Sequence, residues 1–136
     1  MTKSALKYEQ FGEILLREVP SLRMVFDEHL KQHDEILLHV LMGDVTRFLI
    51  SKYREVKAGA KDAEGAAQLV RALLAILEAA MASPDDKLQE LVSVSFLENL
   101  HQAESDYDGI KELLGPALSK ELRALDSGSA ASGRTH

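Results

Sequence analysis

A chain of 136 residues with 46% hydrophobic and 28% charged residues is typical of one globular domain that buries its own core. It has no cysteine, which excludes disulfides, thiolate metal sites and cysteine nucleophiles, and its net charge of −6 disfavours nucleic acid and anionic membranes as partners. No signal-peptide core follows the charged first residues and no apolar run approaches the ~20 residues that span a bilayer, so we expect a cytoplasmic protein without a membrane partner.

Patterns that favour helices run through the whole chain, and alternating strand patterns are nearly absent. Leu and Ala are frequent, and apolar residues recur three and four positions apart. With Ser and Asp at the expected starts, these patterns predict helices over residues 4–18, 22–32, 35–55, 62–82, 85–102 and 110–125. We therefore expect an all-α fold of five to six helices.

Prolines and capping residues divide these helices. Pro20 ends the first helix, and Asp34 is expected to cap the third helix at its N-terminus. Pro84 separates the fourth helix from the fifth. Gly115 and Pro116 interrupt the last helix, because neither residue favours a helix interior.

The fifth helix is apolar over much of its circumference, which is typical of a buried helix. We expect Phe96 to lie in the core, and we expect a turn over residues 106–109 after this helix. Three methionines at apolar positions, Met24, Met42 and Met81, are expected to fill the core.

The predicted domain covers residues 1–125. Its helices are joined by short loops, which favour antiparallel hairpins that close as a bundle or form a short solenoid-like stack. Residues 126–136 (DSGSAASGRTH) are rich in Ser, Gly and Ala, so we expect a disordered tail there.

Three histidines carry the one pattern that suggests a metal or small-molecule site. His29 and His33 are four residues apart and share a face of a continuous helix, and His39 follows nearby. A zinc site needs three or four converging ligands, so a polar helix end is the competing interpretation, and we expect no tightly bound divalent ion.

The sequence contains no arrangement typical of catalysis. It has no GxSxG nucleophile elbow, no phosphate-binding P-loop and no GxGxxG fingerprint. Two alternatives are open for Asp44. One is a surface ion pair with Arg47, three residues on, which would contribute little, and the other is partial burial with a partner, because Asp44 lies inside an apolar stretch. We therefore expect no enzymatic activity and no cofactor.

Two acidic groups are candidate partner-binding surfaces. The first group surrounds the joint between the second and third helices and consists of Asp27, Glu28, Asp34 and Glu35. The second follows the fifth helix and consists of Glu104, Asp106, Tyr107 and Asp108. An exposed tyrosine between two aspartates would be a good interface anchor, although Tyr107 can also fold back onto the helices and leave the carboxylates solvated.

Four segments together resemble a known kind of protein. They are VPSLRMVFDEHL (19–30), LLHVLMGDVTRFL (37–49), LVSVSFLENL (91–100) and LLGPALSKEL (113–122). In this order they resemble a family of small, uncharacterised all-helical bacterial proteins of the toxin-immunity or accessory type, over most of residues 10–125. The shared motifs are structural, so the resemblance implies a fold and a binding role and no catalytic residues.

Two hypotheses about function follow. The first is a non-enzymatic protein-binding module, most concretely an immunity-type protein whose acidic surface binds and neutralises a basic toxin domain, because electrostatic attraction speeds such encounters. The alternative is a metal- or small-molecule-binding regulator that uses the region of His29, His33 and His39.

Overall fold

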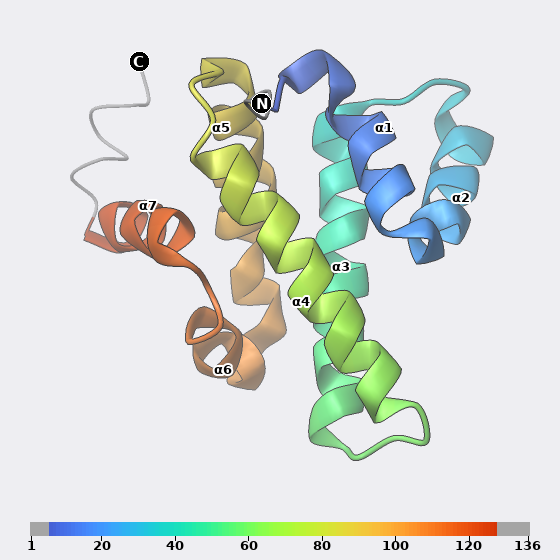
Figure 1. Cartoon of the computed structure of the whole chain (residues 1–136), viewed down its shortest axis with the longest axis vertical. Coiled ribbons are helices and arrows are strands. Elements are labelled where there is room, and N and C mark those ends of the chain that lie inside the picture. The colour runs from blue at the N-terminus through green and yellow to red at the C-terminus, as the bar shows by residue number, and fades with distance from the viewer. Residues whose placement is uncertain (1–5, 128–136) are drawn as a thin grey trace, which may run out of the picture.

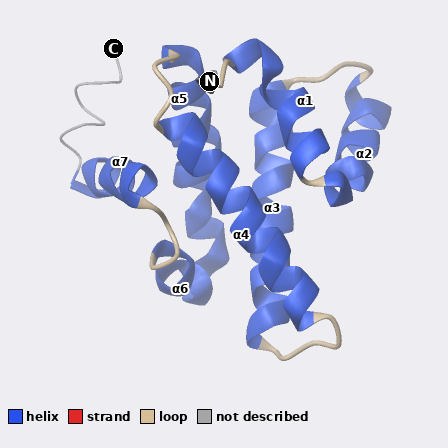
Figure 2. Cartoon of the chain, in the orientation of Figure 1, coloured by secondary structure: helices blue, strands red, loops and turns tan. Residues whose placement is uncertain are grey.

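The computed structural model describes residues 6–127, and these residues form helices and loops with no β-strand (Figures 1 and 2). The prediction of an all-α fold is confirmed. The elements in chain order are α1 (Tyr8–Glu18), the 3₁₀ turn η1 (Pro20–Leu22), α2 (Arg23–His33), α3 (Leu38–Lys57), α4 (Ala63–Met81), α5 (Asp86–Val92), the π-helical segment η2 (Ser93–Leu97), the 3₁₀ segment η3 (Glu98–Asp106), α6 (Tyr107–Lys111) and α7 (Pro116–Ser127).

The long hairpin of α3 and α4 forms the centre of the domain (Figure 1). Helices α1 and α2 lie on one side of it, and α6 and α7 lie on the other. The continuous run α5–η2–η3 packs along α3, and α5 also contacts α4. One hydrophobic cluster joins residues from α1 to α7, so the helices close around a shared core in the manner of a bundle.

Most of the predicted core lies where the sequence placed it. Phe96 is fully buried in the π-helical segment η2, and Met42 and Met81 are also buried. The prediction for Met24 is wrong, because its side chain is 75% exposed on the solvent side of α2. Spacing alone cannot tell which face of a short helix turns inward when its neighbours are unknown.

The predicted start of the third helix is wrong. Helix α3 begins at Leu38, and Asp34 instead ends α2 in the left-handed conformation with φ of 65°. The Asp34 amide donates to the Leu30 carbonyl, which completes the last turn of α2. Leu37, which is extended directly before α3, donates its N–H to His29 Nε2. Aspartate tolerates this backbone conformation better than most residues, so it can close one helix instead of opening the next.

The fifth helix begins as expected after Pro84. The Asp85 carboxylate accepts hydrogen bonds from the amides of Lys87 and Leu88, and it also accepts one from Tyr8 at the start of α1. These backbone bonds, the one from Tyr8 foremost, hold the pKa of Asp85 below its ordinary value. One side chain therefore caps one helix and anchors another.

The expected turn over residues 106–109 is wrong. The helical run continues to Asp106 and changes direction at Glu104, whose φ of 54° and ψ of −113° are not helical. Helix α6 then begins at Tyr107. The sequence around Glu104 contains no proline or glycine, so nothing local marks the bend.

The break at Gly115 and Pro116 is confirmed, and Glu78 of α4 explains it. The Glu78 carboxylate accepts hydrogen bonds from the amides of Ala117 and Leu118 at 2.6 and 3.0 Å and so caps α7. A β-carbon on Gly115 would lie 2.6 Å from Glu78 Cδ, so only glycine allows this close approach.

Helix α7 extends through Ser127. Asp126 and Ser127, the first two residues of the predicted tail, are therefore helical and not part of a disordered segment. The rest of the predicted tail, residues 128–136, lies outside the described residues.

Candidate functional site

The second acidic group contains a buried carboxylate. Asp106 is only 8% exposed, and it accepts hydrogen bonds from Arg54 Nε at 2.8 Å and Lys57 Nζ at 2.7 Å. Arg54 also donates to the Ala103 carbonyl, so the last turn of α3 is tied to the end of η3. The hydrogen bonds from Lys57 and Arg54 lower the pKa of Asp106, and the same contact raises the pKa of Lys57. Asp106 therefore stabilises the fold and cannot be a free partner contact.

Tyr107 folds back onto the protein. Its ring stacks on His101 with the ring centroids 4.4 Å apart, and its hydroxyl donates to Asp126 at 3.2 Å. Burial, together with the charge of Asp126, raises the pKa of Tyr107 to about 12. Of the predicted second group, Glu104 and Asp108 remain exposed, whereas Tyr107 follows the alternative in which it folds back onto the helices.

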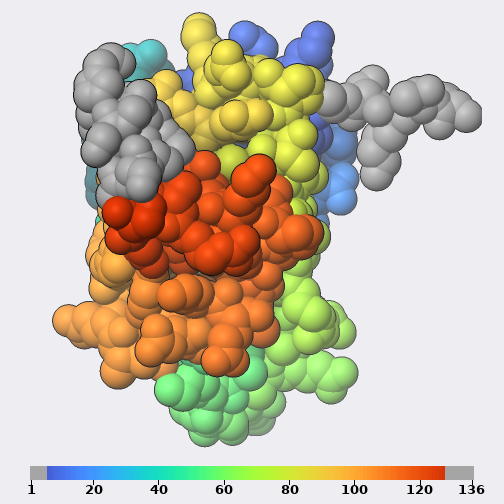
Figure 3. All heavy atoms as spheres, turned by 90° about the vertical axis from the view of Figure 1, so that its left-hand side faces the viewer, coloured from blue at the N-terminus to red at the C-terminus, as the bar shows by residue number. Residues whose placement is uncertain are grey.

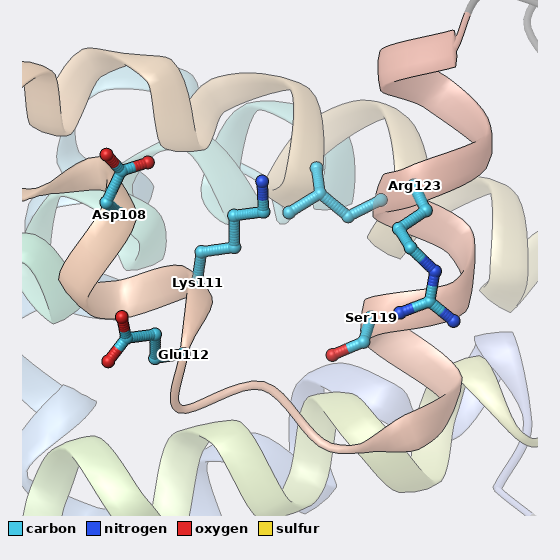
Figure 4. A pocket seen from close by; sticks show the side chains of 6 residues that line it. Asp108, Lys111, Glu112, Ser119 and Arg123 are labelled. Carbon is cyan, nitrogen blue, oxygen red and sulfur yellow. The ribbon is translucent and has the colours of Figure 1, made fainter.

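A cleft of about 500 Å³ separates α6 from α7 beside this group. Asp108 and Glu112 lie on the α6 side, Ser119 and Arg123 on the α7 side, and Lys111 between them (Figure 4). Figure 3 shows the face of the molecule that α6 and α7 form. Two carboxylates and two cations give the cleft no net charge, so it does not form an acidic surface for a basic partner.

The first acidic group has a different environment. Asp27, Glu28, Asp34 and Glu35 are all exposed, and none of them forms an ion pair with another described residue. Glu28 accepts one hydrogen bond, from Gln32 one turn later. The structure therefore leaves these four charges in solvent, as an acidic binding surface requires.

Large apolar side chains are exposed at the same place. Among the described residues, the exposed large hydrophobics are Met24, Leu30, Ile36, Leu37, Val40, Val94 and Leu113, and five of these seven fall between residues 24 and 40. Leu30 shares a face of α2 with Asp27, three positions before it, and Asp34 ends that helix four positions after it. Exposed apolar side chains that gather on one region with a polar rim are typical of interaction sites. We use the term joint surface for Leu30, Ile36, Leu37 and Val40 together with Asp27, Glu28, Asp34 and Glu35.

The three histidines lie around the joint surface but do not form a ligand set. His29 is 1% exposed, and its Nε2 accepts the amide hydrogen of Leu37 at 2.9 Å. The His33 ring lies 4.6 Å from the His29 ring, whereas His39 Nδ1 is engaged with the Ser95 hydroxyl at 2.6 Å. Within residues 6–127, no group of three or more histidine and carboxylate side chains is placed to hold a metal ion.

Asp44 joins this region from α3, where it is partly buried and paired, the second of its two alternatives. Its side chain is 31% exposed and forms an ion pair with Arg47. Its other oxygen lies 3.8 Å from His29 Nδ1, a buried atom without a hydrogen-bond partner. The sequence spacing predicts the pair with Arg47, but His29 is 15 positions away and no local pattern connects it to Asp44.

Sequence reasoning missed the role of the serines in η2. The Ser95 hydroxyl bonds to His39 of α3, and its carbonyl accepts from Thr46 and Asn99. The Ser93 hydroxyl donates to Glu121 of α7 at 2.8 Å. A π-helical turn changes the direction of successive side chains, and here two serines two positions apart reach two different helices. Polar residues inside an otherwise apolar helix are the pattern that could have indicated these contacts.

Two kinds of comparison bear on identity: the helices against the length of a membrane span, and the sequence against known proteins. No helix in the part of the chain that the structure describes is both long and apolar enough to cross a membrane. No curated protein and no solved structure matches the chain. A family model described as a domain of unknown function, DUF7674, matches residues 12–127, a range that runs from α1 to the end of α7. Toxin immunity and a bacterial source are not part of that description. The chain therefore belongs to the DUF7674 family.

Proposed function

We propose that this protein is a non-enzymatic binding module of the cytoplasm that docks a protein partner on its joint surface. The observation that carries the proposal is the gathering of exposed apolar side chains among unpaired carboxylates at residues 27–40. Buried apolar contacts supply affinity at such a surface, and a charged rim sets orientation and association rate.

The charges indicate the chemistry of the partner. Over residues 22–40 the chain has two basic residues, Arg23 and Lys31, against the four acidic residues of the joint surface. A partner that presents an apolar contact ringed by Lys or Arg is complementary to this pattern. The resemblance to immunity-type proteins supports a bacterial toxin domain as that partner, neutralised by the bound module.

The contacts of the histidines give no support to the alternative of a metal- or small-molecule-binding regulator. A histidine ligates a metal through an unprotonated ring nitrogen, and His29 Nε2 already accepts the Leu37 amide hydrogen. His39 Nδ1 is hydrogen bonded to the Ser95 hydroxyl.

A pair of single variants tests the proposal. Val40→Asp places a charge in the joint surface, and Leu113→Asp makes the same change at an exposed apolar side chain on the opposite side of the fold, where Leu113 is 50% exposed. Proteins captured from native cells by the wild-type chain should also be captured by Leu113→Asp and should be lost with Val40→Asp. Equal capture by both variants would place the binding site elsewhere.

The captured protein then tests the finer statement. Its expression alone should arrest growth, and co-expression of the wild-type chain or Leu113→Asp should restore growth while Val40→Asp does not. Asp34→Lys with Glu35→Lys should slow association and flatten its dependence on salt. A captured protein that is harmless would contradict toxin immunity and leave the binding role in place.

A further inference from the structure

We infer that His29 makes the joint surface sensitive to pH, because protonation of its ring removes the acceptor that holds Leu37 in place. The inference rests on the proposed function, since it concerns the regulation of the same surface. It starts from a buried ionisable ring whose Nε2 accepts the Leu37 amide hydrogen and whose Nδ1 has no hydrogen-bond partner.

The hydrogen bonds of His29 fix its tautomer. Nε2 accepts the Leu37 N–H at 2.9 Å, so Nε2 carries no hydrogen and a neutral ring must carry its hydrogen on Nδ1. That Nδ1 is buried and has no hydrogen-bond partner. The closest carboxylate oxygen, Asp44 Oδ2, lies 3.8 Å away, which is too far for a hydrogen bond.

Protonation changes both sides of the ring. The imidazolium has a hydrogen on each nitrogen, so Nε2 can no longer accept from Leu37 and two donors face each other. The new positive charge is attracted to Asp44 on the other side. The ring is thus driven away from Leu37 and toward Asp44 by the same event.

The neighbouring groups leave this response intact. Helix α2 packs against η1, which has no titratable side chain, and against α3, which presents Asp44 with its partner Arg47. On α2 itself the His33 ring lies beside His29, and Asp34 and Glu35 follow in the connection to α3. His39 of α3 is engaged with Ser95. None of these groups is hydrogen bonded to the Leu37 amide, so none replaces the lost acceptor.

Leu37 connects the ring to the surface. It precedes the first residue of α3, and its side chain is one of the exposed apolar residues of the joint surface, between Ile36 and the first turn that carries Val40. Loss of the Leu37 hydrogen bond releases the connection between Asp34 and the start of α3. A surface whose apolar contacts are no longer held in one arrangement binds more weakly, so affinity falls as the pH falls.

The test uses the chain alone. In spectra recorded from about pH 8 down to about pH 5, the ¹⁵N resonance of His29 Nε2 and the amide resonance of Leu37 should change together. Protection of the Leu37 amide from hydrogen exchange, corrected for intrinsic rates, should fall about tenfold over this range. His29→Gln supplies an amide oxygen as a non-titrating acceptor and should abolish both changes, whereas His33→Gln should keep them.

Each result is decisive. A Leu37 resonance that does not follow His29 in the wild-type chain overturns the inference, whether or not the variants fold. A titration that persists in His29→Gln or disappears in His33→Gln overturns it as well. Failure of the proposed function would be seen separately. Val40→Asp and Leu113→Asp would then capture the same proteins, while the Leu37 resonance would still follow the pH. Where a partner is captured, its affinity should decline at acidic pH for the wild-type chain and stay constant for His29→Gln.

Discussion

The two acidic groups have nearly the same composition and opposite environments. At the end of η3, Asp106 receives Arg54 and Lys57 from α3, and Tyr107 covers the neighbouring surface. At the joint between α2 and α3, four carboxylates remain in solvent beside exposed apolar side chains. The difference shows that an acidic segment keeps its charges in solvent only where no distant cation neutralises them.

Replacing one glycine in each region by alanine should give the largest difference in the free energy of unfolding. A β-carbon on Gly109 would overlap the Tyr53 hydroxyl and lie 3.0 Å from Tyr53 Cζ, whereas one on Gly12 would lie 3.6 Å from Leu38 Cδ2 near the joint. We expect Gly109→Ala to lower the free energy of unfolding by about 2 kcal/mol. Gly12→Ala should raise it by up to about 1 kcal/mol, because alanine favours a helix. Urea unfolding measures both, and equal effects would contradict the tighter packing around α6.

Removal of one charge from each region gives the next contrast. Asp106→Asn takes the negative charge from Arg54 and Lys57 and should lower the melting temperature by roughly 5 °C. Asp27→Asn removes an unpaired, exposed charge and should leave the melting temperature within about 1 °C. Thermal unfolding followed by circular dichroism measures both melting temperatures. Equal shifts in melting temperature for the two variants would mean that the contacts of Asp106 with Arg54 and Lys57 do not stabilise the fold.

At acidic pH, the difference in melting temperature between the wild-type chain and Asp106→Asn should become smaller. Because the pKa of Asp106 is lowered in the folded state, its ionisation stabilises the fold above the ordinary aspartate pKa of 3.8, and this contribution is lost as the pH falls through the lowered value. The melting temperature of the wild-type chain should therefore approach that of Asp106→Asn below about pH 4. A gap that stays constant from neutral to acidic pH would show that the variant acts through packing.

Backbone conformation gives the smallest contrast. Each region contains one carboxylate residue with positive φ, Asp34 at 65° and Glu104 at 54°. Asp34 lies in the left-handed region that aspartate tolerates, whereas the ψ of −113° at Glu104 belongs to a region that glycine favours. Glu104→Gly should stabilise the protein by about 1 kcal/mol, and Asp34→Gly by a few tenths. The reverse order in urea unfolding would contradict these conformations.

The sequence predicted the features that depend on local chemistry. Pro20 ends α1, α5 begins just after Pro84, and Gly115 with Pro116 interrupts the last helix, because each effect acts within a few residues. The start of α3 was misplaced because His29 captures the Leu37 amide from eight positions away. The burial and pairing of Asp106 depend on Lys57 and Arg54, which are 49 and 52 positions away in the sequence. No local sequence pattern predicts a pairing over such a separation.

The contacts at the start of α1 also determine when that helix can be completed. Its first amide, on Tyr8, bonds to Asp85, and the Leu6 carbonyl accepts from the Ser83 hydroxyl, each across 77 positions of sequence. During synthesis, α1 leaves the ribosome long before residues 83–85 exist, so its start has neither partner. Contacts over such separations close late because a long loop must first be ordered. In a nascent chain, α1 is therefore expected to dock only after α4 has emerged. The helix that is synthesised first would then be among the last to reach its final packing.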